Sequence, residues 1–262
     1  MSREQSERIK AKDQINTLEN AEYLDMIYKD QLTWTVSTRK GLYRQMNLFH
    51  AKKVLEVGSG TNALINEIQE INPRIFVVGT DKNLMALTHV INKGHSGHIV
   101  HGEGASLPYI AQCFDITLCH YFLMWANDPL KVLQEMVRVT KIGGWVACLA
   151  EPDYGGRLDY PNSDLWKKLV LDSLSAVDPY IGRKLPSLFF RAGLKARVGV
   201  QSTVFSSTDL KNLYAKELEK LERFLPSDKR GELKKLKQFY SKNLEESFSF
   251  MPVFYAIARK DK

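Results

Sequence analysis

The stretch Val54-Leu55-Glu56-Val57-Gly58-Ser59-Gly60-Thr61 decides the fold of this chain. Its apolar residues predict a buried strand over 53–57, and its two glycines predict a sharp turn after that strand. A helical pattern over 62–71 follows at once, and the first turn of a helix presents free N–H groups. A strand, a glycine turn and a helix in this order form the nucleotide-binding corner of a doubly wound α/β domain.

Glu56 sets this corner apart from the common dinucleotide-binding one, whose strand is usually apolar up to the first glycine. A carboxylate beside a pyrophosphate would be repelled, because the two charges have the same sign. It suits a ligand that carries positive charge, as S-adenosylmethionine does on its amino group and its sulfonium. Asp81 ends a second apolar run, 75–79, where a carboxylate accepts hydrogen bonds from ribose hydroxyls.

Strands and helices alternate through the middle of the chain. Helices are predicted over 82–92 and 128–140, and further strands over 99–101, 116–119 and 145–150. This alternation predicts an α/β fold with a parallel sheet and right-handed crossovers.

The N-terminal residues have a helical pattern of their own. An amphipathic helix is predicted over 1–33 and a second, shorter one over 38–50. We expect residues 1–50 to form a helical cap over the active site.

The C-terminal part departs from the alternation of strands and helices. Strands are predicted over 196–205 and 247–259, and charged helices over 208–225 and 229–245. We expect 206–246 to be a helical insertion between the last two strands of one domain that spans 1–262.

Composition narrows the class of protein. Hydrophobic residues make up 44% of the 262 residues, which is typical of a globular protein. The three cysteines have no C-x-x-C spacing, and neither a signal peptide nor a membrane span is recognisable, so we expect a cytoplasmic protein without a metal or a membrane. The net charge of +7 permits nucleic acid as a partner. Lys and Glu interleave over 211–237, which favours a solvated basic surface and makes nucleic acid the less favoured partner.

The loop Gly102-Glu103-Gly104-Ala105-Ser106-Leu107-Pro108 follows the third predicted strand. Its small residues allow a flat base to approach closely, and Glu103 can accept a hydrogen bond from an exocyclic amino group such as that of adenine.

Five motifs in this order resemble those of class I S-adenosylmethionine-dependent methyltransferases. They are VLEVGSGT (54–61), VVGTD (77–81), GEGASLP (102–108), FDITLCHYFLMWANDP (114–129) and KIGGWVACLAEPDYGG (141–156). The resemblance implies a Rossmann-like, seven-stranded, mostly parallel sheet with the last strand antiparallel and helices on both faces. It implies S-adenosyl-L-methionine as the cofactor and S-adenosyl-L-homocysteine as its product.

The resemblance also implies a set of cofactor-binding residues, in which Cys119 and His120 lie on the methionine side. Arg39 is a candidate partner for the methionine carboxylate, since a guanidinium fork suits a carboxylate, although a surface arginine is an equal alternative. The full set is Arg39, Glu56, Gly58, Gly60, Asp81, Lys82, Glu103, Gly104, Cys119 and His120.

The methyl acceptor is expected to contact the N-terminal helices and the loop after the fifth strand. Phe122, Trp125 and Tyr154 are aromatic, and the loop over 151–161 adds carboxylates. Aromatic walls with carboxylates suit a cationic acceptor such as an amine. No catalytic residue is assigned, because methyl transfer from a sulfonium needs alignment more than a general base.

A narrower resemblance comes from the N-terminal helix, the Thr38-Arg39 pair and the EPDYGGRLDYP loop (151–161). These are similar to methyltransferases that tailor thiazole/oxazole-modified peptides of the plantazolicin type. The resemblance implies dimethylation of the α-amine of an N-terminal arginine in a peptide antibiotic. By it, Asp159 and Thr38 would hold the substrate guanidinium.

Other functions stay open at this point. Residues 58–63 also fit the G-x-G-x-x-A pattern of NAD-dependent oxidoreductases, against which Glu56 argues. An O-methyltransferase of another small metabolite, an RNA methyltransferase and a non-catalytic protein of the same fold are the remaining alternatives.

Overall fold

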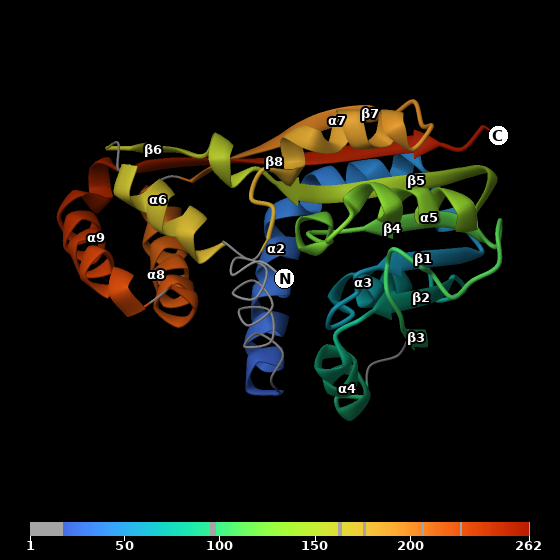
Figure 1. The fold of residues 1–262 in the computed structure, drawn as a ribbon, viewed down its shortest axis with the longest axis horizontal. Helices are drawn as coiled ribbons and strands as arrows, with labels where there is room; N and C mark the ends of the chain where they lie inside the picture. Colours follow the sequence, from blue (N-terminus) through green and yellow to red (C-terminus); the bar gives the residue numbers. More distant parts are fainter. Residues whose placement is uncertain are drawn as a thin grey trace, which may run out of the picture.

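The computed structural model describes residues 18–94, 98–161, 164–174, 177–205, 207–225 and 227–261. Figure 1 shows a central sheet with helices on both of its sides and a group of helices at one end. In these described ranges no helix is both long enough and apolar enough to cross a membrane.

The described residues form one eight-stranded sheet in the order β3-β2-β1-β4-β5-β8-β6, and β7 pairs with β8. Neighbours among β1 to β5 are parallel, whereas β8 is antiparallel to β5, β6 and β7. The strands are β1 (Lys53–Val57), β2 (Phe76–Asp81), β3 (His98–His101), β4 (Phe114–Cys119), β5 (Thr140–Pro152), β6 (Leu158–Tyr160), β7 (Arg197–Phe205) and β8 (Phe248–Arg259).

The predicted α/β fold with an antiparallel last strand is confirmed, but the expected number of seven strands is wrong. The additional strand, β6, has three residues and pairs with the start of β8. So short a segment carries no readable alternation of apolar and polar residues, and its partner is remote in sequence. Gly143 and Gly144, expected to precede the fifth strand, lie inside the longer β5.

Helices lie on both sides of the sheet, and α6, α8 and α9 form a group at one end of it. The α-helices are α2 (Leu18–Gln45), α3 (Ala63–Ile71), α4 (Leu84–Asn92), α5 (Pro129–Val139), α6 (Asp164–Ser173), α7 (Ile181–Arg191), α8 (Ser207–Phe224) and α9 (Arg230–Asn243). Short 3-10 helices are η1 (Leu48–His50), η2 (Leu123–Trp125), η3 (Tyr154–Gly156), η4 (Ser227–Lys229) and η5 (Leu244–Glu246).

The N-terminal region forms one helix where two were expected. α2 runs without a break through Thr33–Thr38, a segment of low helix propensity in which four of the six residues are β-branched. Thr35 in this segment and Arg39 just after it are buried, so packing offsets the weak propensity. The part of the predicted first helix before residue 18 lies outside the described residues. α6 and α7 were not predicted.

Apolar clusters cover both faces of the sheet. Leu55 packs in the cluster that contains α5 and α7, whereas its neighbour Val54 packs in the one that contains α2 and α3. Consecutive strand residues point to opposite faces, so a strand buried on both sides needs a continuous apolar run. This double burial fixes β1 in the middle of the sheet, and the turn that follows it is held in place.

Candidate active site at the carboxyl ends of β1, β2 and β4

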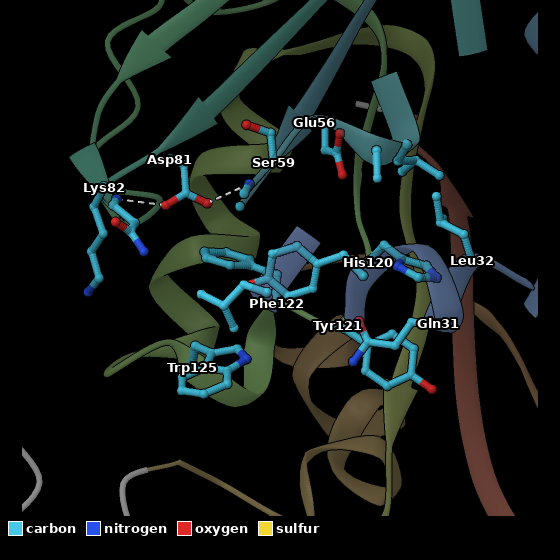
Figure 2. Close-up of a pocket in the computed structure, with 17 residues that line it drawn as sticks. Gln31, Leu32, Glu56, Ser59, Asp81, Lys82, His120, Tyr121, Phe122 and Trp125 are labelled. Atoms are coloured by element: carbon cyan, nitrogen blue, oxygen red, sulfur yellow. Dashed lines mark hydrogen bonds between the residues drawn. The ribbon is translucent and has the colours of Figure 1, made fainter. Parts of the chain in front are cut away.

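A cavity of about 230 Å³ opens where β1, β2 and β4 end. Its lining includes Glu56 from β1, Asp81 from β2 and the loop after β4, and α2 forms a further wall with Tyr28 and Leu32. Figure 2 shows Glu56, Asp81 and Leu32 among the side chains that line it. The carboxyl edge of a parallel sheet is where doubly wound domains bind their ligands, so the cavity is the candidate active site.

The glycine turn is crowded by aromatic rings of the chain itself. Gly58 and Gly60 have φ angles of +75° and +50°, which non-glycine residues rarely adopt. A Cβ on Gly58 would lie 2.0 Å from the Phe122 ring, and one on Gly60 would lie 2.7 Å from the Tyr28 ring. Both glycines are therefore required for backbone conformation and for close approach.

Asp81 is built into the same turn. One carboxylate oxygen accepts a hydrogen bond from Gly60 N at 2.8 Å, and the other accepts one from Asn83 N at 2.7 Å. Burial raises the pKa of Asp81. The carboxylate is thus held at the cavity by backbone donors that do not use all of its acceptor capacity.

Glu56 carries an unpartnered carboxylate oxygen. The residue is 3% exposed, lines the cavity, and its Oε2 has no hydrogen-bond partner among the described residues. Burial raises the pKa of Glu56 well above its ordinary value, and the negative charge of Asp81 raises it further. A buried acceptor without a partner costs free energy. The group therefore fits a ligand that brings a cationic hydrogen-bond donor, as the amino group of S-adenosylmethionine does.

Arg39 has other partners than the expected methionine carboxylate. Its guanidinium is buried and makes a two-fold contact with the Glu67 carboxylate, with Nε at 2.8 Å from Oε1. Nη1 donates to Leu32 O at 2.9 Å and to Thr35 Oγ1. Arg39 is not among the residues that line the cavity. Its role in the structure is to tie α2 to α3.

Cys119 ends β4 and His120 follows it, and the two side chains have different surroundings. His120 lines the cavity, and its Nε2 lies 3.0 Å from Thr35 Oγ1. Burial, with the charge of Arg39, lowers the pKa of His120 to about 3, so the ring is neutral. Cys119 is fully buried against Cys148 at 3.4 Å between the sulfur atoms, and it does not line the cavity.

Lys82 lines the cavity and lies 3.5 Å from Glu103, with both side chains about half exposed. Glu103 and Gly104 do not line the cavity themselves. A Cβ on Gly104 would meet the Phe122 ring at 2.9 Å, so this ring separates Gly104 from Gly58. A ligand that lay against both glycines would have to displace it.

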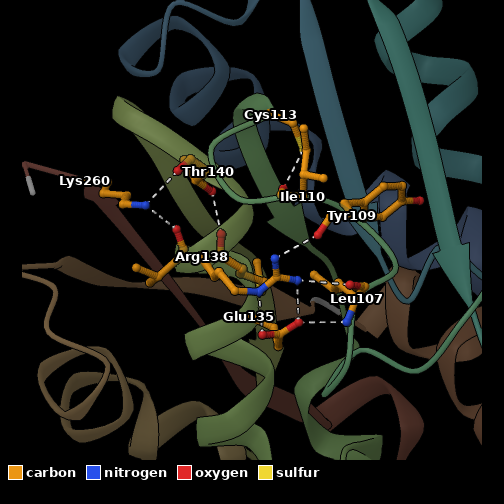
Figure 3. Close-up of polar contacts among 10 residues, drawn as sticks. Leu107, Tyr109, Ile110, Cys113, Glu135, Arg138, Thr140 and Lys260 are labelled. Atoms are coloured by element: carbon orange, nitrogen blue, oxygen red, sulfur yellow. Dashed lines mark hydrogen bonds and ion pairs between the residues drawn. The ribbon is translucent and has the colours of Figure 1, made fainter.

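The loop that carries Glu103 and Gly104 is anchored by α5 (Figure 3). Glu135 accepts a hydrogen bond from Leu107 N at 2.9 Å. Arg138 donates to Tyr109 O at 2.8 Å and to Leu107 O at 3.0 Å, and it pairs with Glu135. Sequence reasoning missed this anchor, although a Glu and an Arg at i and i+3 of a helix are a recognisable pair.

Phe122 and Trp125, predicted to contact the substrate, both line the cavity. Their loop is held by a residue that sequence reasoning did not assign to the site. Glu151, at the end of β5, is fully buried and accepts hydrogen bonds from Phe122 N at 3.0 Å and Leu123 N at 2.8 Å. A carboxylate just after an apolar strand was a signal that could have identified it.

Asp159 holds a guanidinium that belongs to the chain itself. Its carboxylate is 4% exposed and receives Arg157 Nε at 3.0 and 2.9 Å and Ser249 Oγ at 2.8 Å. Arg157 also pairs with Glu217 of α8 and stacks on Trp166, 4.7 Å from the ring centre. We predicted that this carboxylate holds a substrate guanidinium, and in the structure it already pairs with an internal arginine, Arg157.

Thr38 and Tyr154 do not line the cavity either. Thr38 is half-buried within α2, and Tyr154 is half-buried in η3, where it packs against two apolar clusters. The structure thus places several of the predicted residues at one cavity: Glu56, Gly58, Gly60, Asp81, Lys82, His120, Phe122 and Trp125. It leaves Thr38, Arg39, Glu103, Gly104, Cys119, Tyr154 and Asp159 outside its lining.

Comparison with known proteins finds similarity to methyltransferases. Residues 55–148 match the model of a methyltransferase domain. A demethylmenaquinone methyltransferase of Geobacillus stearothermophilus is 32% identical over 128 residues, which are 47% of this chain and 53% of the relative. The match therefore spans about half the length of that relative.

Two solved structures share the fold. One is a candidate methyltransferase of Bacillus halodurans, with a TM-score of 0.60 and 18% identity, covering 86% of this chain and 100% of that one. The other is phosphoethanolamine N-methyltransferase 2 of Haemonchus contortus in complex with S-adenosyl-L-methionine, with a TM-score of 0.54 and 15% identity, covering 80% and 49%. The chain therefore resembles a methyltransferase domain over residues 55–148 and has a Rossmann-like methyltransferase fold.

Proposed function

We propose that this protein is an S-adenosylmethionine-dependent methyltransferase that acts on a small molecule or a modified peptide. The observation that carries the proposal is the unpartnered Oε2 of Glu56, buried at the cavity beside the glycine turn. A pyrophosphate would be repelled by this group, whereas an ammonium would satisfy it. The match of residues 55–148 to a methyltransferase domain supports the same donor.

Different residues of the cavity would contact different parts of S-adenosylmethionine. Glu56 would hold the amino group, Gly58 and Gly60 would let the donor lie against backbone, and Asp81 would accept from the ribose hydroxyls. The donor, when bound, supplies a methyl group already activated on a sulfonium. The protein then aligns the acceptor with that methyl group and excludes water, and such alignment supplies much of the rate.

For the acceptor we propose an amine, methylated on nitrogen. Tyr28, Phe122 and Trp125 line the cavity as aromatic walls, which favour a cationic or weakly solvated amine. The narrower proposal, dimethylation of the N-terminal arginine of a thiazole/oxazole-modified peptide, loses the support of Asp159, which Arg157 occupies.

A second candidate is an aromatic acceptor of the quinone kind. A demethylmenaquinone methyltransferase resembles about half of this chain, and the quinone in the name of that relative favours this candidate. The same aromatic rings of the cavity would stack on such a molecule.

Calorimetry with S-adenosylhomocysteine and with NAD tests the donor. We expect S-adenosylhomocysteine to bind and NAD not to bind. Asp81→Ala should weaken that binding by about tenfold or more, since it removes hydrogen bonds to a charged acceptor. Asp128→Ala is the matched control, because Asp128 caps α5 through Lys131 N and does not line the cavity. Binding of NAD alone would refute the donor assignment.

One assay with a labelled methyl donor distinguishes the two classes of methyl acceptor. Argininamide and an arginine-first azole peptide represent amines, and a hydroxynaphthoquinone represents the second candidate. Labelled methyl groups on nitrogen support the amine, whereas label on the quinone alone refutes it.

A further inference from the structure

The imidazole of His120 is held at the cavity by one of its two nitrogens. Nε2 lies 3.0 Å from Thr35 Oγ1, and Nδ1 has no hydrogen-bond partner among the described residues. The residue lines the cavity, and Figure 2 shows the ring among the other lining side chains. What the free nitrogen can do depends on which nitrogen carries the proton.

The hydroxyl of Thr35 decides the position of that proton. Thr35 Oγ1 lies 2.8 Å from Gln31 O, to which it donates, and a hydroxyl has only one proton to donate. Arg39 Nη1 donates to the same oxygen. With the hydroxyl proton directed at Gln31 O, the shorter of the two contacts, the contact of Oγ1 to His120 Nε2 is one in which Nε2–H donates. Nδ1 is left with a bare lone pair.

A salt bridge holds this arrangement in place. Arg39 is fixed by its two-fold contact with Glu67 of α3, so its guanidinium cannot turn away from Thr35. Burial and the charge of Arg39 lower the pKa of His120 to about 3, which keeps the ring neutral. The ring, which belongs to a residue that lines the cavity, therefore carries an uncharged hydrogen-bond acceptor at Nδ1.

We infer that Nδ1 of His120 accepts a hydrogen bond from the N–H of the methyl acceptor, and that Thr35 and Arg39 are positioning residues that keep Nδ1 bare. The inference rests on the proposed function and names a substrate contact within it. It also changes the role expected for His120, from a contact with the methyl donor to a contact with the methyl acceptor. The carboxylate of the donor has no proton to offer Nδ1, and the ammonium of the donor is matched by Glu56.

The reaction balances with this contact. The nitrogen lone pair of the neutral amine forms the new N–C bond, the C–S bond breaks, and its electron pair stays on sulfur as the thioether. The proton on nitrogen stays there, so the product leaves as a methylated ammonium. His120 orients the lone pair toward the methyl group by holding the N–H, and it need not take the proton.

Two substitutions separate the nitrogens of the ring. His120→Asn keeps an acceptor near the position of Nδ1, and His120→Gln keeps a polar atom near that of Nε2. With argininamide as the acceptor, we expect His120→Gln to raise KM about tenfold or more. We expect His120→Asn to stay within about threefold of the wild-type KM, and the affinity for S-adenosylhomocysteine to stay within about twofold in both variants.

The positioning role is tested at Thr35. Thr35→Val removes the hydroxyl that assigns the tautomer, so we expect a higher KM for argininamide with little change in kcat. Thr35→Ser restores the hydroxyl and should restore KM. If both variants behave alike, Thr35 acts only in packing, and the assignment of the tautomer through its hydroxyl is wrong.

A nitrogen NMR spectrum of the imidazole in the S-adenosylhomocysteine complex needs no acceptor. We expect a protonated Nε2 and a pyridine-type Nδ1. A protonated Nδ1, or equal KM values for His120→Asn and His120→Gln, would overturn the inference. So would a loss of S-adenosylhomocysteine affinity without a change in KM. Failure of the proposed function is distinct, because the wild-type protein would then not bind S-adenosylhomocysteine at all.

Discussion

Gly58 and Gly94 share a left-handed backbone conformation but differ in their surroundings. Their φ angles are +75° and +64°. A Cβ on Gly58 would lie 2.0 Å from the Phe122 ring, whereas a Cβ on Gly94 would meet nothing within 4 Å. The pair therefore separates the cost of backbone strain from the cost of steric contact.

Gly58→Ala should lower both stability and affinity for S-adenosylhomocysteine. Each alanine at a positive φ costs about 1–2 kcal/mol. Gly58→Ala must also displace Phe122, so we expect it to weaken affinity by about tenfold or more. Thermal denaturation and calorimetry measure both effects. Gly94→Ala is the control and should change stability alone. Equal affinities in the two variants would contradict the role of the turn.

Glu151 should make stability depend on pH. Burial raises its pKa from the ordinary 4.5 to about 7. The folded state thus keeps this proton to a higher pH than the unfolded state does, so stability falls as pH rises from about 4.5 to 7. Relative to Glu151→Gln, the free energy of unfolding of the wild type should fall by about 3 kcal/mol over that range.

Urea denaturation across this pH range measures the difference. Gln keeps an acceptor for Phe122 N and Leu123 N, so the loop after β4 stays anchored in the variant. The carboxyl groups of Glu56 and Asp81 also have raised pKa values, but they are present in both proteins and cancel. Parallel pH curves for wild type and variant would show that Glu151 titrates normally.

At the scale of elements, Arg157 joins β6 to α8. It pairs with Asp159 and with Glu217, and its own side chain is 2% exposed. An arginine buried this far needs its carboxylates, since removal of one partner leaves an uncompensated charge. The contact therefore fixes the helical group at the end of the sheet against the first residues of β8.

Asp159→Ala should lower the free energy of unfolding by about 3–5 kcal/mol and leave the affinity for S-adenosylhomocysteine unchanged. Urea denaturation and calorimetry measure the two quantities. Glu222→Ala is the control, because it breaks an exposed ion pair with Lys237 in the same helices and should have little effect. A rise in the KM for argininamide with unchanged stability would return Asp159 to a substrate role.

At the scale of the whole molecule, the net charge of +7 leaves RNA as an alternative substrate. Some lysines of α6, α8 and α9 are paired with carboxylates, among them Lys216 with Asp30 and Lys168 with Glu232. Paired lysines release fewer counterions when they meet phosphates. The basic balance is thus a weak argument for nucleic acid.

We expect this protein to bind tRNA weakly and to lose that binding as salt rises to about 0.15 M. Filter binding over a salt series measures the affinity, and a labelled methyl donor measures incorporation into tRNA. The small-molecule assays serve as the positive control for methyl transfer. Tight binding at that salt concentration, with label in the RNA, would favour an RNA methyltransferase over the function proposed.

The sequence by itself determined the α/β fold, most of its strands and the edge of the sheet where the cavity lies. These features are local, because a buried strand, a glycine turn and a helix each follow from neighbouring residues. It also determined Glu56 and Asp81 as residues of that edge, since the ends of parallel strands meet there, and the family resemblance added His120.

Only the tertiary structure decided which charged side chains are free to meet a ligand. Arg39 and Asp159 have the right chemistry for a substrate or a cofactor, yet Glu67 and Arg157 already satisfy them. Those partners lie on other elements, and pairing depends on distances between atoms that are set only when the elements pack. The sequence shows which side chains are charged, but which groups they pair with depends on the folded structure.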